Sequence, residues 1–239
     1  MNRRLLTFLL AMTAVMVARA AVPVDSVAML KERIIRAYGV DRFEGIEALR
    51  YTFNIQMGEN RVRREWTWEP RGGCVTFRGK GPGSSTPIEY AYTHGAIDTA
   101  DTSITAYVDK RFVNDNYWLL FPFHMIWDSN TVITTGSQFP APEQSRNGRL
   151  LVQYSAGGYT PGDSYELFPA ADGRLAWWVF RKGGKQEQGS AMTWEKHVRL
   201  GPITVCVEHY NPDRTFHLWF SDLAVRMRGS DKWIDAVPE

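Results

Sequence analysis

The chain has 239 residues, of which 44% are hydrophobic and 13% aromatic, and its formal net charge is +2. The first twenty residues hold three arginines and no acid, so the rest of the chain carries a net charge of −1. A near-neutral chain does not attract the phosphates of nucleic acid across its surface, which excludes nucleic acid as a predicted partner.

Residues 1–20 are predicted to be a cleaved signal peptide. Arg3 and Arg4 precede an apolar run, and Ala18-Arg19-Ala20 is a small-x-small cleavage site, so cleavage is expected after Ala20 or one residue later. The run is too short to anchor the chain in a bilayer, and no cysteine stands at the junction for acylation. We therefore expect a periplasmic or secreted protein with one β-rich domain over residues 21–239.

The mature chain is predicted to begin with one amphipathic helix over residues 26–39. Apolar side chains recur on one helical face, and Gly39 suits the C-terminal end. The expected role of this helix is to pack against a sheet. The residues on the apolar face are Val27, Leu30, Ile34, Ile35 and Tyr38.

Strands are predicted on both sides of residue 120. Alternation of apolar and polar residues indicates a first antiparallel meander over residues 49–92 and a second over residues 150–225, the latter with a continuous strand over residues 192–200. We count roughly ten strands, which favours one large sheet, a sandwich or a barrel. The predicted fold class is α+β, with a strongly curved antiparallel sheet that forms an incomplete, half-open β-barrel.

The segment Asn114–Asp128 separates the two meanders, and its residues 117–127, in which His124 is the one readily ionisable side chain, are apolar on all sides. Such a segment has to be enclosed by protein or to cover an apolar ligand. Asn114 or Asn116 can cap a helix, and Pro122 cannot lie in the middle of one, so we expect a short helix that ends near Leu120 or Phe121, followed by a kink. We predict that this segment is a central helical plug in the hollow of the sheet.

The chain shows no motif of metal or nucleophilic chemistry. The five histidines lack the spacing of a zinc site, and neither a Gly-x-Ser-x-Gly elbow nor a phosphate-binding glycine loop is present. We predict no metal, no cofactor and no catalysis. Cys74 and Cys206 leave two alternatives open, a disulfide permitted by export or two buried free thiols in strands.

Nine tryptophans are the remaining unusual feature of the composition. Aromatic side chains line apolar ligand pockets, and they also fill ordinary cores. The aromatic residues predicted to contact a lipophilic ligand are Trp66, Trp68, Tyr117, Trp118, Phe121, Phe123, Trp127, Trp177 and Trp194.

Several segments resemble an uncharacterised exported family related to the outer-membrane lipoprotein carriers, the Lol carriers. Residues 114–123 resemble the family's plug, residues 159–167 and 176–178 its central hairpin, and residues 192–197, 201–203 and 220–222 its late pattern of aromatic residues and turns. The resemblance implies a half-open barrel that encloses an apolar cavity and shields acyl chains.

The leading functional hypothesis is therefore noncatalytic binding of a lipid or lipoprotein acyl chain, with a membrane-associated protein as a further candidate partner. A second hypothesis is a structural or protein-interaction module whose core is filled. A third is a hydrolase at the barrel mouth that uses His94 or His124 as a base.

Overall fold

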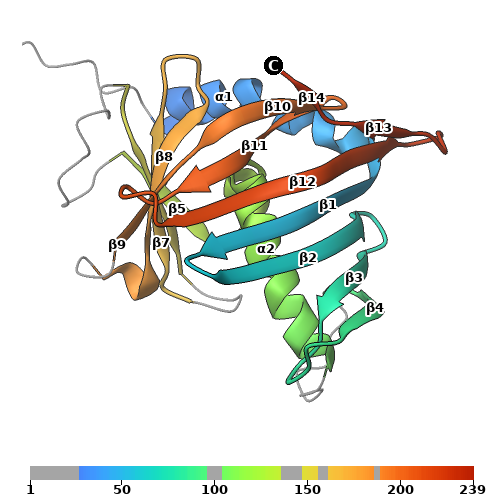
Figure 1. The fold of residues 1–239 in the computed structure, drawn as a ribbon. Coiled ribbons are helices and arrows are strands. Elements are labelled where there is room, and N and C mark those ends of the chain that lie inside the picture. Colours follow the sequence, from blue (N-terminus) through green and yellow to red (C-terminus); the bar gives the residue numbers. More distant parts are fainter. Residues whose placement is uncertain (1–26, 96–103, 136–146, 156–160, 186–188) are drawn as a thin grey trace, which may run out of the picture.

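The computed structural model describes residues 27–95, 104–135, 147–155, 161–185 and 189–239 (Figure 1). The predicted signal peptide lies outside these ranges. Within them, none of the helices combines the length and the apolar character needed to span a bilayer.

The described chain is an α+β fold with two antiparallel sheets, which confirms the predicted class. The larger sheet has nine strands, ordered β14-β10-β11-β12-β1-β2-β3-β4, with β13 paired to β12. The smaller sheet has five, ordered β5-β6-β7-β8-β9. The strands of the larger sheet are β1 (Ile46–Met57), β2 (Asn60–Glu69), β3 (Cys74–Lys80), β4 (Pro87–Thr93), β10 (Glu195–Leu200), β11 (Ile203–Tyr210), β12 (Phe216–Met227), β13 (Trp233–Asp235) and β14 (Val237–Pro238). Those of the smaller sheet are β5 (Thr131–Thr134), β6 (Leu150–Tyr154), β7 (Ser164–Pro169), β8 (Leu175–Arg181) and β9 (Gly189–Thr193).

The single curved sheet expected from the sequence is thus divided into two. The predicted continuous strand over residues 192–200 is interrupted at Trp194, where the chain leaves β9 of the smaller sheet and enters β10 of the larger one. Lys196 just beyond has a left-handed φ of 56°, a local bend that alternation of side chains does not reveal. Neither strand path closes on itself, so the half-open barrel stays a prediction.

The N-terminal helix α1 (Val27–Tyr38) forms as predicted, with Leu30, Ile34 and Tyr38 buried. Gly39 ends it in the left-handed conformation, with φ of 67°. A Cβ at this position would lie 3.0 Å from the Pro202 carbonyl oxygen, so glycine meets both a conformational and a spatial requirement. The chain then turns through a 3-10 helix, η1 (Val40–Gly45), into β1. A second short 3-10 helix, η2 (Lys182–Gly184), follows β8.

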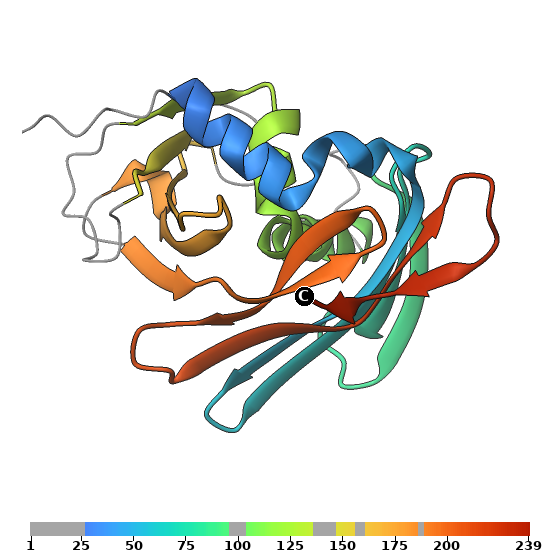
Figure 2. The same ribbon diagram turned by 90° about the horizontal axis from the view of Figure 1, so that it is seen from above.

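The helix α2 (Ile104–Trp127) lies between the two sheets (Figures 1 and 2). Its ring contacts reach β2, where Phe112 lies 5.5 Å from Trp66, and β7, where Phe121 lies 4.4 Å from Tyr165. The helix departs from helical dihedral angles at Leu120, two residues before Pro122, so the predicted kink is confirmed.

The predicted start of this helix is wrong, because α2 already includes residue 104. Asn114 and Asn116 therefore lie inside the helix and do not cap it. The polar residues Thr105, Asp109, Lys110 and Arg111 leave this first part of the helix without a clear apolar face in the sequence. Asp109 nevertheless is buried, because its carboxylate accepts hydrogen bonds from Tyr92 (2.9 Å) and His94 (2.6 Å).

Candidate functional site

The structure separates the nine predicted ligand-binding aromatic residues into a buried set and a partly exposed set. The buried residues, at most 3% exposed, are Trp66, Phe121, Phe123 and Trp194. The remaining five are partly or clearly exposed, namely Trp68, Tyr117, Trp118, Trp127 and Trp177. The interior around the kink of α2 is filled, because Leu119, Leu120, Phe121 and Phe123 are all 0% exposed.

Two of the exposed residues, Trp68 and Trp127, line an apolar pocket of about 490 Å³. This volume lies within the range of small-molecule sites. Phe43 connects the lining, since its ring lies 4.7 Å from that of Trp127, 6.0 Å from that of Trp68 and 5.4 Å from that of Phe123. We call this site the apolar pocket; its other lining residues are Val40, Asp41, Glu44, Ile46, Pro70, Arg71 and Arg228.

Three elements meet at the apolar pocket. The 3-10 helix η1 contributes Phe43, the inner face of β2 contributes Trp68, and the last turn of α2 contributes Trp127. Trp127 is 39% exposed, because the helix ends there. Sequence reasoning missed Phe43, since it is a single aromatic residue between Arg42 and Glu44 with no periodic pattern around it. Phe43 could have been found from its place in the short connection between the first helix and the first strand, because so short a connection keeps an aromatic side chain close to both elements.

The rim of the apolar pocket is charged. Asp41 and Glu44 stand on η1, and Arg71 and Arg228 stand on the chain that follows β2 and β12. The Arg228 guanidinium donates a hydrogen bond to the carbonyl oxygen of Glu44 and so ties η1 to the end of β12. An apolar floor with a charged rim suits a ligand that has an apolar body and a polar end.

A polar cluster adjoins the Trp127 side of the pocket. The Asp128 carboxylate accepts hydrogen bonds from the hydroxyls of Tyr117 (2.5 Å) and Tyr154 (2.9 Å), and the Nδ1 atom of His124 lies 3.4 Å away. Burial acts to raise the pKa of Asp128, but these hydrogen bonds outweigh it and the pKa is lowered. Because the other ring nitrogen of His124 lies 2.7 Å from the Asn116 side-chain oxygen, this histidine is held on both sides and is poorly placed to act as a base.

The predicted residues Trp118 and Trp194 meet elsewhere, in a second aromatic group with Trp178 and His209. Trp118 lies 4.5 Å from Trp178 and 5.3 Å from His209, and Trp194 lies 4.8 Å from His209. His209 is fully buried, and burial lowers its pKa to about 3, so it is neutral and its Nδ1 donates to the Thr193 carbonyl (3.0 Å). Among the described residues, the Nε1 atoms of both buried tryptophans and the Nε2 atom of His209 have no hydrogen-bond partner.

Both cysteines are free thiols. Cys74 lies on β3 and Cys206 on β11, with β12, β1 and β2 between them in the sheet. Neighbouring strands are about 4.8 Å apart, so this spacing is far beyond the Cα separation of a disulfide. Cys206 is buried, its thiol donates to the Glu195 carbonyl (3.0 Å), and burial raises its pKa. Within the described ranges, no three His, Cys, Asp or Glu side chains are placed to hold a metal ion.

These observations define an α+β protein with two antiparallel sheets, one central helix and an aromatic surface pocket. No protein-family model matches the chain, and no curated protein matches it in sequence.

Solved structures with a similar fold include a DUF1329 family protein from Desulfovibrio piger, with 10% identity and a TM-score of 0.43 over 86% of this chain and 94% of that one. Another is a putative outer membrane lipoprotein-sorting protein domain from Vibrio parahaemolyticus, with 10% identity and a TM-score of 0.39 over 87% of this chain and 94% of that one. Since both similarities are weak, the predicted relationship to the Lol carriers stays a prediction, and function is argued from the residues of this chain.

Proposed function

We propose that the protein is an exported, noncatalytic binding protein that holds a lipid or another acyl-chain ligand in the apolar pocket. The observation that carries the proposal is the joint lining of that pocket by Phe43, Trp68 and Trp127. Each methylene group removed from water contributes about 0.8 kcal/mol, so a pocket of this kind binds by burial and needs no reactive group. The charged rim is suited to the polar end of such a ligand.

The proposal keeps the predicted class of ligand but changes the place where it binds. The predicted interior residues Phe121 and Trp194 pack against other side chains, so we assign them to the core that supports the pocket. The half-open barrel, the periplasmic location and transfer to a membrane-associated partner protein belong to the same proposal. The open strand order of the larger sheet is compatible with a half-open barrel, and the arginines and apolar run of residues 1–20 favour export.

The test is titration of the purified mature protein with a dansyl-labelled undecanoic acid, read by dansyl fluorescence. We expect binding by the wild type and at least tenfold weaker binding by Trp127→Ala, because that ring is exposed and forms part of the floor. Trp177→Ala is the matched control, since this tryptophan is also partly exposed but lies on β8 outside the pocket. Equal affinity of Trp127→Ala and wild type contradicts the proposed site.

The filled interior around α2 favours a second candidate function, a structural or protein-interaction module. The same titration separates the two functions. A wild-type protein that binds neither the labelled acid nor phospholipid vesicles at micromolar concentration supports the module and contradicts lipid binding.

A further inference from the structure

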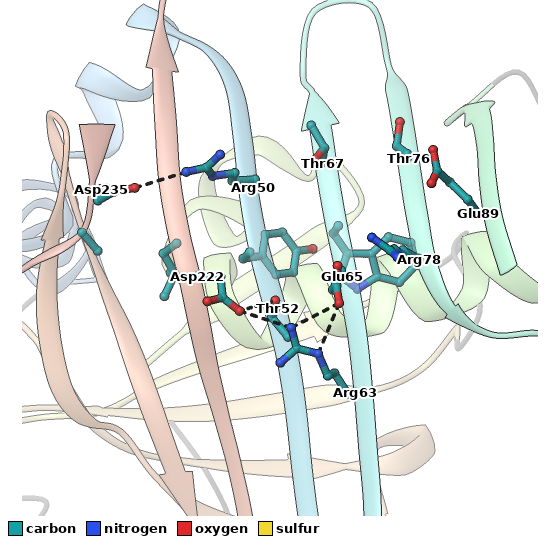
Figure 3. A pocket seen from close by; sticks show the side chains of 14 residues that line it. Arg50, Thr52, Arg63, Glu65, Thr67, Thr76, Arg78, Glu89, Asp222 and Asp235 are labelled. Carbon is teal, nitrogen blue, oxygen red and sulfur yellow. Dashed lines mark hydrogen bonds and ion pairs between the residues drawn. The ribbon is translucent and has the colours of Figure 1, made fainter. Parts of the chain in front are cut away.

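The outer face of the larger sheet carries a second hollow, of about 830 Å³, which we call the polar groove (Figure 3). Its floor is formed by short side chains at matching positions of neighbouring strands. Thr67 on β2 lies opposite Arg50 on β1 and Thr76 on β3. In the next row, Glu65 lies opposite Thr52 and Arg78. The hollow exists because threonines stand between longer charged side chains.

Asp222 is aimed into the polar groove by an unusual backbone. The pairing of β1 with β12 shifts register between Arg50 and Thr52, and Asp222 at this irregularity has a left-handed φ of 55°. Bulges of this kind redirect a side chain, and left-handed residues other than glycine are uncommon. One oxygen of the carboxylate, Oδ2, accepts from Thr52 (2.9 Å), Ser221 (3.1 Å) and Arg63 (3.5 Å).

Arg63 fixes a second carboxylate beside the first. Its guanidinium donates to Oε1 of Glu65 through Nε (3.2 Å) and Nη2 (3.1 Å), and it also reaches Asp222 (Figure 3). In the part of the chain that the structure describes, all these bonds use one oxygen of each carboxylate. The other two oxygens, Oδ1 of Asp222 and Oε2 of Glu65, remain as acceptors held in place by their neighbours.

Donors stand next to these acceptors. Within the described ranges, the guanidinium of Arg78 and the hydroxyls of Thr67 and Thr76 have no hydrogen-bond partner, although all three line the groove. The lining therefore offers fixed acceptors and available donors side by side. A ligand whose neighbouring groups both donate and accept satisfies such a lining best.

The charge of the lining narrows the class of ligand further. Three arginines face four carboxylates, so the lining mixes both signs and carries a net charge of only −1, which favours neither a phosphate nor a polyamine. The arginines are Arg50, Arg63 and Arg78, and the carboxylates are Glu65, Glu89, Asp222 and Asp235. Vicinal hydroxyls of a sugar are neutral, and each is both donor and acceptor.

An aromatic stack adjoins the polar groove on the same face. Tyr210 stacks on His217 at 4.3 Å, and His217 stacks on Trp219 at 4.4 Å, with interplanar angles of 5° and 21°. Trp219 lies opposite Asn54 on β1, which in turn lies opposite Arg63. The stack therefore runs from β11 onto β12, and Trp219, which is not part of the groove lining, stands two residues before Ser221 on the same strand. Indole faces offer an apolar platform for the C–H face of a sugar ring.

We propose that the polar groove binds a neutral oligosaccharide through Glu65, Arg78 and Asp222. This site lies on the opposite face of the sheet from the inward ring of Trp68 and is independent of the apolar pocket. A secreted protein with both sites holds an apolar ligand on one face and a glycan on the other.

The test exposes the full mature protein to an array of immobilised neutral and acidic oligosaccharides, followed by calorimetry with the strongest soluble neutral binder. We expect wild-type retention on neutral glycans. We expect at least tenfold weaker binding by Arg78→Ala and by Glu65→Gln, since each removes a charge-assisted hydrogen bond. Arg61→Ala is the matched control, because this exposed arginine lies on the same strand outside the groove.

Three outcomes overturn the proposal: no glycan retained, retention of acidic glycans only, or equal binding by wild type and Arg78→Ala. Near-ultraviolet circular dichroism of each variant shows that the fold is intact. Fatty-acid binding measured on the same preparations separates a failure of the polar groove from a failure of the apolar pocket.

Discussion

The apolar pocket and the polar groove use opposite faces of the same strand. On β2, Trp66 and Trp68 point toward α2, whereas Glu65 and Thr67 line the polar groove. Adjacent residues thus serve two unrelated chemistries, because side chains in a strand alternate between faces. The inner face gains its stability from burial, and the outer face is free to present hydrogen-bonding groups to solvent.

The arginines of β2 show the same contrast in one pair of neighbours. Arg64 points inward and makes two hydrogen bonds of 2.6 Å to Asp115 of α2, whose side chain is 0% exposed. Arg63 points outward, and its side chain is 58% exposed. Burial raises the pKa of Asp115, and Arg64 opposes this effect. The buried carboxylate of Asp115 therefore needs Arg64 as a partner, whereas the exposed carboxylate and guanidinium groups around Arg63 are also solvated by water.

The largest expected effect comes from breaking the inner pair. Asp115→Ala leaves the Arg64 guanidinium, and the indole nitrogen of Trp66 that also bonds Asp115, without an acceptor. Removal of one member of a buried ion pair lowers the free energy of unfolding by about 3–5 kcal/mol. We expect a loss of this size when the free energy of unfolding is measured by urea denaturation. Glu65→Ala on the outer face is the control, with an expected loss below about 1 kcal/mol. Similar losses for both variants contradict the contrast between the faces.

A smaller effect is expected from acid. The pKa of His209 is about 3 in the folded protein because of burial, against an ordinary value of about 6.5 in the unfolded chain. Between these two pKa values the unfolded chain binds a proton at His209, whereas the folded protein does not. The free energy of unfolding therefore has its full value above about pH 6.5 and falls by up to about 1.4 kcal/mol per pH unit below it.

His209→Asn checks this assignment, because its amide can still donate to the Thr193 carbonyl but does not titrate. Unfolding midpoints measured from pH 7.5 to 4 should fall less steeply in the variant than in the wild type. His197, whose pKa burial lowers to about 4, adds to the wild-type slope and remains in the variant. Parallel curves for the two proteins contradict a role for His209.

The sequence predicts the secondary structure correctly where a residue and its near neighbours along the chain determine the local conformation. Alternation predicts β1 and β2, and helical spacing predicts α1, because each pattern reflects burial of one face. The kink near Pro122 follows from local chemistry in the same way. The first part of α2 escaped prediction, since Asp109 is polar yet buried by pairing with Tyr92.

The two candidate sites depend on contacts that no local pattern contains. The apolar pocket needs Phe43 and Trp127 to meet, and the polar groove needs Thr52 beside Asp222, 170 positions later. The predicted list of aromatic residues therefore included part of the pocket lining but also core residues such as Phe121. A count of aromatic residues cannot separate a ring that fills a core from one that borders a hollow.

The smallest expected effect concerns the ion pair at the edge of the polar groove. The Arg50 guanidinium lies 3.3 Å from the Asp235 carboxylate, with side chains that are 43% and 79% exposed. Exposed pairs contribute roughly 0.2–1 kcal/mol, and salt screens them. A double-mutant cycle with Arg50→Ala and Asp235→Ala should give a coupling free energy in that range. We expect this coupling to be smaller in about 0.5 M sodium chloride, because salt screens exposed charges. A coupling free energy above about 2 kcal/mol that does not change with salt would mean that ion pairs on the outer face stabilise the fold as strongly as those on the inner face. This result would contradict the contrast between a buried face that stabilises the fold and an exposed face that is free to bind a ligand.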